Sequence, residues 1–206
     1  VFTIPTRWPD YFWLDRYFVS VGDGGFKLST PSLPDTSASR LGSRGFQDMH
    51  VVDLENDGDP DVIGYDTSPM TGQKIIVYAN NGDGTFSFDA ARVPAGLPAT
   101  EGVVRISAAD FNLDGFTDLF HLSWKTGFSG NASFYLENDG TGHFHRKDWA
   151  VPAIDGATAV LDVDRNGLPD FLNWDYLGNL ALYVANVDDL YAGSQALPAK
   201  GVGTTI

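Results

Sequence analysis

The sequence predicts an all-β fold made of repeated four-stranded units, and three observations lead to this prediction. Three nine-residue stretches with one plan of acidic and amide side chains begin at Asp53, Asp110 and Asp162. Each is followed by a short run of apolar and aromatic residues that is typical of a β-strand. The stretches start 57 and then 52 residues apart, a period consistent with propeller blades of four antiparallel strands.

The three stretches have the composition of calcium loops. Each carries oxygen-bearing side chains at positions 1, 3, 5 and 9 and a glycine at position 6. Calcium takes six to eight oxygen ligands, and the glycine permits the tight turn that lets the side chains converge. We therefore expect three calcium sites, with the carbonyl of position 7 as a further ligand. The expected ligands are Asp53, Glu55, Asp57, Asp59 and Asp61 in the first loop, Asp110, Asn112, Asp114, Phe116 and Asp118 in the second, and Asp162, Asp164, Asn166, Leu168 and Asp170 in the third.

Two other interpretations of these loops were weighed. An EF-hand loop requires Glu at position 12, where this chain has Gly64, His121 and Asn173, and strand-like residues follow instead of a helix. Ordinary acidic surface turns are the other alternative, because Asp, Asn and Gly are common in turns. Three copies in register favour metal binding over that alternative.

The segment Ile106-Ser-Ala-Ala-Asp110-Phe-Asn112-Leu-Asp114-Gly115-Phe-Thr-Asp118-Leu-Phe resembles the FG-GAP/VCBS repeat. This repeat is found in integrin α-chain propellers and in many secreted proteins and lectins. The resemblance implies a β-propeller with calcium in the loop that joins the first two strands of a blade. The Phe-Gly and Gly-Ala-Pro landmarks are poorly kept, so the match is nearer to the degenerate VCBS form.

The period divides the chain into four units of one propeller domain, at residues 1–46, 47–102, 103–155 and 156–206. The second unit is the most complete, and its Asn-Gly and Asp-Gly pairs predict a hairpin turn before Phe86. The first unit begins partway through the strand succession. About four blades are therefore expected, either as a small closed propeller or as part of a larger one.

Charge and composition limit the possible partners. The formal charge is −14, and the three loops hold 11 of the 27 acidic residues, so much of the acidity is explained by metal ligation. No cluster of Lys and Arg is present to bind nucleic acid, and no apolar run approaches the roughly 20 residues of a membrane span. Because simple extracellular modules bind calcium at millimolar levels, the expected location is extracellular, secreted or on the cell surface.

The sequence shows no catalytic motif, and we expect a protein that is not an enzyme. It has no cysteine, no nucleophile elbow and no phosphate-binding loop. His143 and His145 alternate on a strand and could share a metal, although no acidic partner is obvious beside them. His121 is expected to be a packed or solvent-facing histidine.

Binding function is expected on the face opposite the calcium loops, where connections vary in length from repeat to repeat. The candidate ligand-binding residues are Trp124, Lys125, Asp66 and Asp175, with Trp124 in a polar, glycine-bearing turn. Trp13 and Trp174 are expected to pack between blades. The expected function is a calcium-stabilised interaction or structural module that binds an extracellular protein or glycan. The alternatives are a calcium-dependent lectin and an accessory domain of a larger secreted enzyme.

Overall fold

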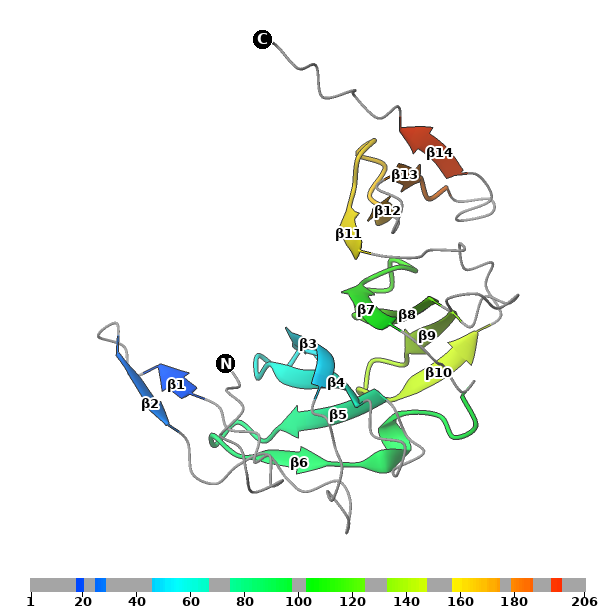
Figure 1. Cartoon of the computed structure of the whole chain (residues 1–206). Coiled ribbons are helices and arrows are strands. Elements are labelled where there is room, and N and C mark those ends of the chain that lie inside the picture. Colours follow the sequence, from blue (N-terminus) through cyan, green and yellow to red (C-terminus); the bar gives the residue numbers. More distant parts are fainter. Residues whose placement is uncertain are drawn as a thin grey trace. The chain divides into compact units, whose positions relative to one another are not determined.

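The chain is built of β-strands, as Figure 1 shows. The computed structural model describes residues 18–20, 25–28, 46–66, 75–97, 103–124, 133–147, 157–174, 179–186 and 194–197. In these ranges the one helical element is a single 3₁₀ turn, η1 (Ala90–Arg92). The all-β prediction is therefore confirmed.

In the part of the chain that the structure describes, the strands form one two-stranded hairpin, β1-β2, and three four-stranded antiparallel sheets, β3-β4-β5-β6, β7-β8-β9-β10 and β11-β12-β13-β14. Each sheet runs in sequence order, which is the arrangement predicted for the repeats. The strands are β1 (Phe18–Ser20), β2 (Phe26–Leu28), β3 (Phe46–Val52), β4 (Asp61–Asp66), β5 (Ile75–Asn80), β6 (Phe86–Phe88), β7 (Val103–Ala109), β8 (Asp118–Trp124), β9 (Phe134–Asn138), β10 (Phe144–Lys147), β11 (Ala157–Leu161), β12 (Asp170–Trp174), β13 (Leu180–Tyr183) and β14 (Ser194–Leu197).

The acidic loops join the first and second strands of the three sheets. The strand pairs end at Val52 opposite Asp61, at Ala109 opposite Asp118 and at Leu161 opposite Asp170. Position 9 of every loop is therefore the first residue of a strand. This places all three loops at the same end of their sheets.

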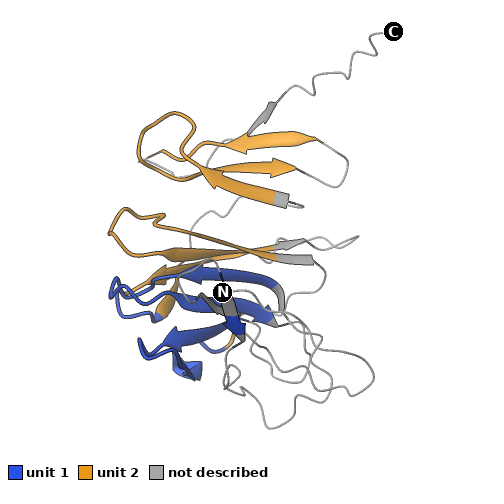
Figure 2. Ribbon diagram, turned by 90° about the vertical axis from the view of Figure 1, so that its left-hand side faces the viewer, with its two compact units in different colours: residues 1–95, 140–143 blue, residues 96–139, 144–206 orange. Residues whose placement is uncertain are grey.

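By its contacts the chain divides into two compact units, residues 1–95 with 140–143 and residues 96–139 with 144–206 (Figure 2). The first unit contains sheet β3–β6. Its core includes Val62, Ile76 and Tyr78, against which Phe86 and Phe88 pack. Strand β5 is buried along nearly its whole length, which agrees with its run of Ile, Val and Tyr.

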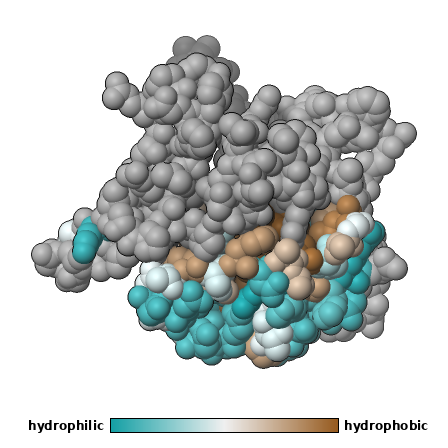
Figure 3. Space-filling model, turned by 90° about the horizontal axis from the view of Figure 1, so that it is seen from below, coloured by the Kyte–Doolittle hydropathy of each residue, from teal (hydrophilic) through white to brown (hydrophobic). Residues whose placement is uncertain are grey.

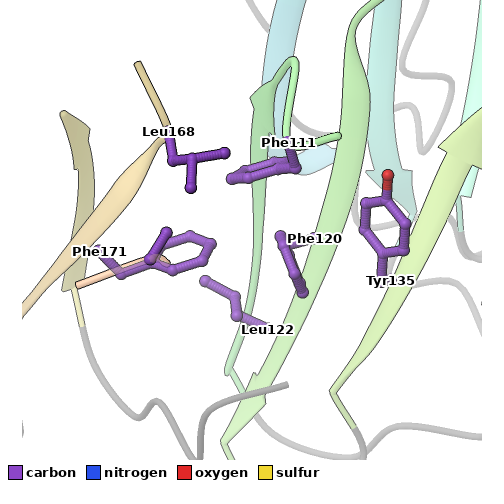
Figure 4. Packing of buried hydrophobic residues seen from close by; sticks show 7 residues of the cluster. Phe111, Phe120, Leu122, Tyr135, Leu168 and Phe171 are labelled. Carbon is purple, nitrogen blue, oxygen red and sulfur yellow. The ribbon is translucent and has the colours of Figure 1, made fainter. Parts of the chain in front are cut away.

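In the second unit, sheets β7–β10 and β11–β14 pack against each other (Figure 4). The ring of Phe111, in the second acidic loop, stacks on Phe171 of β12 with ring centroids 5.5 Å apart. The ring of Phe120, in β8, meets the Phe171 ring edge-on, with ring centroids 5.1 Å apart. The buried cluster consists of Phe111, Phe120, Leu122, Tyr135, Leu168, Phe171 and Ala185. The third acidic loop contributes Leu168, so the loops take part in the core as well as in the turns.

Burial differs between the repeats at position 2 of the acidic loops. Leu54 and Phe111 are both 0% exposed, whereas Val163 is 47% exposed. Phe111 is covered by the next sheet of the second unit. Within the described residues, the corresponding side of sheet β11–β14 has no such cover.

The second strand of each sheet shows the same difference in burial at the end away from the acidic loop. Tyr65 of β4 and Leu122 of β8 are 2% and 3% exposed, whereas Trp174 of β12 is 58% exposed. Trp174 was predicted to pack between blades, but no described residues cover its side of β12. Trp13 lies outside the described residues.

Most of the described surface in Figure 3 is hydrophilic, with apolar residues gathered in a band on the same face. This agrees with the acidic composition of the chain. The described residues include no helix with the length and apolar character needed to span a membrane.

Candidate metal centres

The three acidic loops follow the same backbone path. Position 4 and position 6 both have positive φ in every loop. The angles are 57° at Asn56, 61° at Leu113 and 64° at Arg165, and 93°, 94° and 88° at Gly58, Gly115 and Gly167. Glycine adopts this conformation readily, whereas Leu and Arg rarely do. The sequence pattern predicted the turn at the glycine but not the positive φ at position 4. Asn56 was the one signal for it, because asparagine tolerates this conformation better than Leu or Arg.

The aspartate at position 1 closes each loop. Asp53 accepts hydrogen bonds from the backbone N–H groups of Asp57 (3.1 Å) and Gly58 (2.8 Å). The carboxylates of Asp110 and Asp162 accept the equivalent bonds in the second and third loops. Two bonds to one carboxylate hold the loop in a tight curl, which brings the position 1 side chain onto the backbone of positions 5 and 6.

The side chain at position 5 orients the residue at position 7. The Asp57, Asp114 and Asn166 oxygens accept the N–H groups of position 7 at 2.9, 2.9 and 2.7 Å. Asp59, Phe116 and Leu168, whose carbonyl oxygens are predicted calcium ligands, therefore lie in the same turn as the side-chain ligands.

The aspartate at position 9 is buried and connects the loop to the end of the third strand of its sheet or, in the third loop, to Ala185 just after that strand. In the second loop, one oxygen of Asp118 accepts the N–H of Phe111 (3.1 Å) and the other accepts the N–H of Asn138, at the end of β9 (2.8 Å). Asp61 and Asp170 make the corresponding pairs of bonds, to Leu54 and Asn80 and to Val163 and Ala185. This carboxylate therefore fixes the loop to the sheet, a role that the sequence pattern did not reveal.

Two asparagines that precede the hairpin turns also support the loops. The Asn80 amide donates to the Pro60 carbonyl and the Asn138 amide to the Thr117 carbonyl, both at 3.1 Å. From the sequence these asparagines were interpreted only as turn residues. Their recurrence before Gly82 and Gly140 was the signal that could have revealed them.

Burial raises the pKa values of two of the position 9 carboxyl groups. The pKa of Asp61 rises to about 7, mainly by burial and further by the hydrogen bond and negative charge of Glu55. Burial raises the pKa of Asp118 to about 6, although the Tyr135 hydroxyl (2.6 Å) and two backbone N–H groups favour its charged form. The pKa of Tyr135 is raised by burial and by this aspartate. A cation nearby would favour the charged carboxylates.

The third loop brings together the carboxylates that a metal ion requires. Oxygens of Asp162, Asp164 and Asp170 all lie within 4.8 Å of one another. Oxygens that share one calcium ion at about 2.3–2.6 Å can be no more than about 5 Å apart. The donors are hard oxygens, so the residues present fit calcium.

The second loop has the same hydrogen bonds but an amide at position 3. Asn112 accepts the N–H of Asp114 at 3.0 Å and donates to its carboxylate at 2.9 Å. In the first loop, Glu55 forms an ion pair with Arg92, which sequence reasoning missed. The predicted ligand Glu55 thus contacts Arg92 as well as Asp61 of its own loop.

The predicted ligand-binding residues are described only in part. Asp66 and Trp124 are the last residues of β4 and β8, at the ends of these strands opposite the acidic loops. Trp124 was predicted to lie in a turn, but its backbone pairs with Val103 and extends the strand. Lys125 and Asp175 lie outside the described residues.

The histidines do not form a common site with one another. The Nε2 atom of His143 lies 3.8 Å from Asp89, and that of His145 lies 3.3 Å from Asp139. His121 is buried and stacks on Phe134 with ring centroids 4.3 Å apart, as expected for a packed residue.

The chain was compared with known protein families and curated proteins. Residues 67–121 match the family model of the FG-GAP-like repeat. This segment includes the second acidic loop, on which the resemblance was based. No curated protein matches the chain. The predicted resemblance is confirmed for this segment, and residues 67–121 carry an FG-GAP-like repeat.

Proposed function

We propose that this chain is a calcium-stabilised β-propeller module of the extracellular space or cell surface, which binds a protein or glycan and is not an enzyme. The observation that carries the proposal is the convergence of Asp162, Asp164 and Asp170 in a loop whose backbone path recurs twice more. One acidic turn is common on protein surfaces. Three loops with the same φ angles and the same carboxylate hydrogen bonds favour a shared ligand.

The second and third loops would hold calcium through the side chains at positions 1, 3, 5 and 9 and the carbonyl at position 7. In the first loop, Asp53, Asp57 and Asp61 would offer carboxylates at positions 1, 5 and 9, as Asp110, Asp114 and Asp118 do in the second loop. When bound, calcium would neutralise carboxylates that lie close together. The protein's own contribution is the curled backbone, which holds these oxygens in place before the ion arrives.

The propeller is supported by the face-to-face packing of sheets β7–β10 and β11–β14. Sheets of four antiparallel strands, each packed on the next through apolar side chains, are the blades of such a fold. The uncovered side of β11–β14 bears Val163 and Trp174, at positions that are buried in the other two sheets. We propose that a further blade covers this side.

The proposed binding surface is the end of the sheets opposite the acidic loops. Asp66 and Trp124 lie at this end, and the proposal extends to Lys125 and Asp175. Replacing Trp124 and Lys125 with Ala is expected to weaken binding to a partner once it is found. A glycan array separates the two partner classes, since binding to a defined sugar would favour the lectin alternative.

Calcium removal tests the metal proposal directly. With a Kd of order 10⁻⁴ M and millimolar calcium, each site contributes roughly 1.4 kcal/mol, and three contribute about 4 kcal/mol. Because whole domains are stable by only about 5–15 kcal/mol, excess EGTA is expected to lower the melting temperature strongly. An unchanged melting temperature would contradict the proposal.

Ion counting tests the individual loops. Asp110→Ala and Asp162→Ala should each lose one bound calcium ion in mass spectrometry of the intact protein, because each removes the carboxylate at position 1. Asp139→Ala, which changes an exposed aspartate outside the loops, is the matched control and should lose none. Retention of all ions by both loop variants would refute the ligand assignment.

A further inference from the structure

The first acidic loop differs from the others at position 3. In the second and third loops, the position 3 side chain accepts the N–H of position 5, at 3.0 Å in Asn112 and 3.1 Å in Asp164. Glu55 is one methylene longer than aspartate, and its carboxylate pairs with the guanidinium of Arg92.

Local structure positions Arg92 for this contact. It is the last residue of η1, which follows β6. Asp89 caps η1: its carboxylate accepts the N–H of Ala91 at 2.8 Å and its carbonyl accepts the N–H of Arg92 at 3.3 Å. The Glu55 and Arg92 side chains are only 22% and 15% exposed, so water screens the pair weakly.

The β9–β10 turn lies against this ion pair within the first unit. A Cβ atom at Gly142 would overlap both the Arg92 guanidinium and the Glu55 carboxylate. The φ of Gly142 is also positive, at 72°. Glycine therefore leaves the space that the pair fills, and a permanent positive charge is fixed beside the first loop.

We propose that Arg92 is a built-in competitor for calcium in the first loop. This inference rests on the proposed calcium function. The Glu55 oxygen that pairs with Arg92 is not free to bind calcium, and the guanidinium stays charged because it does not deprotonate in proteins. The first loop therefore binds calcium more weakly than the other two and fills only at a higher concentration. The chain would thus respond to calcium in two steps.

The experiment is a calcium titration of the full chain followed by native mass spectrometry. In the wild type, two ions should bind before the third, and Asp57→Ala should remove the late step and so assign it to the first loop. Arg92→Gln removes the charge while keeping a polar side chain. Because a hydrogen bond to a charged group is worth about 1.5–3 kcal/mol, the late step should move to roughly 10- to 100-fold lower calcium.

Three further variants make the result specific. Arg92→Lys keeps the charge, so the third ion should still bind late. Glu55→Asp shortens the side chain to that of Asp164 and should bring the third step forward even if Arg92→Gln folds poorly. Arg165→Gln removes a positive charge from the third loop and should leave the late step in place.

The outcomes separate this inference from the proposed function. If no loop of the wild type binds calcium, the calcium proposal itself fails. If all three ions bind together, or if neither Arg92→Gln nor Glu55→Asp advances the third step, only the role of Arg92 is refuted.

Discussion

Sheets β7–β10 and β11–β14 have the same strand order and the same acidic loop, yet they bury different parts of themselves. Phe111, in the acidic loop of sheet β7–β10, is buried because Phe171 of sheet β11–β14 stacks on it. Val163 occupies the same position in the acidic loop of sheet β11–β14, and its side chain is half exposed. In repeat architectures each unit contacts its neighbours, so the burial of a unit depends on the next unit as much as on its own sequence. Under the propeller proposal, a further blade would cover the exposed side of sheet β11–β14.

The largest expected effect is that of Phe111→Ala. Removing a fully buried aromatic ring leaves a cavity between the two sheets, and such changes cost about 3–5 kcal/mol. Chemical denaturation in saturating calcium measures the loss. A loss below about 1 kcal/mol would show that the two sheets do not pack in solution as Figure 4 shows them.

Val163→Asn tests whether a further blade covers sheet β11–β14. If it does, an amide replaces a buried valine, and a loss of about 3 kcal/mol is expected from the lost apolar burial and the added polar group. Leu113→Asn is the matched control, since Leu113 is 53% exposed and its positive φ suits asparagine. A change within about 0.5 kcal/mol in both variants would mean that no blade covers Val163, against the propeller proposal.

A smaller effect is expected from Tyr135→Phe, which sharpens the comparison between the second and third loops. Tyr135 donates to Asp118 at 2.6 Å, whereas Leu182 stands at the equivalent position in β13. Loss of a hydrogen bond to a carboxylate should lower the free energy of unfolding by about 2 kcal/mol. An unchanged stability would mean that hydrogen bonds from the two backbone N–H groups stabilise the Asp118 carboxylate equally well without the hydroxyl.

The sequence predicted the all-β class and the acidic loops because both depend on local chemistry. Alternating and β-branched residues specify strands such as β5, and the spacing of Asp and Gly specifies the curl from Asp110 to Asp118. The hairpin turn before Phe86 was predicted from its Asn-Gly and Asp-Gly pairs. These signals are all contained within a few consecutive residues.

The parts that were missed depend on contacts between distant residues. Arg92 is 37 residues from Glu55, and nothing in either local sequence couples them. The exposure of Trp174 likewise depends on the cover over β12, because an apolar strand residue has the same local sequence whether its sheet has a neighbour or not. The positive φ of Leu113 was hidden for a different reason, since the loop imposes a conformation that leucine itself disfavours.

The carboxylate that joins each loop to the third strand also has a consequence for protein engineering. Its backbone partner, at the end of the third strand or just after it, lies 19, 20 and 15 residues further along the chain in the three repeats, and yet the bond length is 2.8 Å in each. The second strand ends and the third begins at the opposite end of the sheet, so the number of residues in the connection between these two strands does not alter this bond. Peptides could therefore be grafted into that connection, and the acidic loop would keep its shape while the inserted sequence varied.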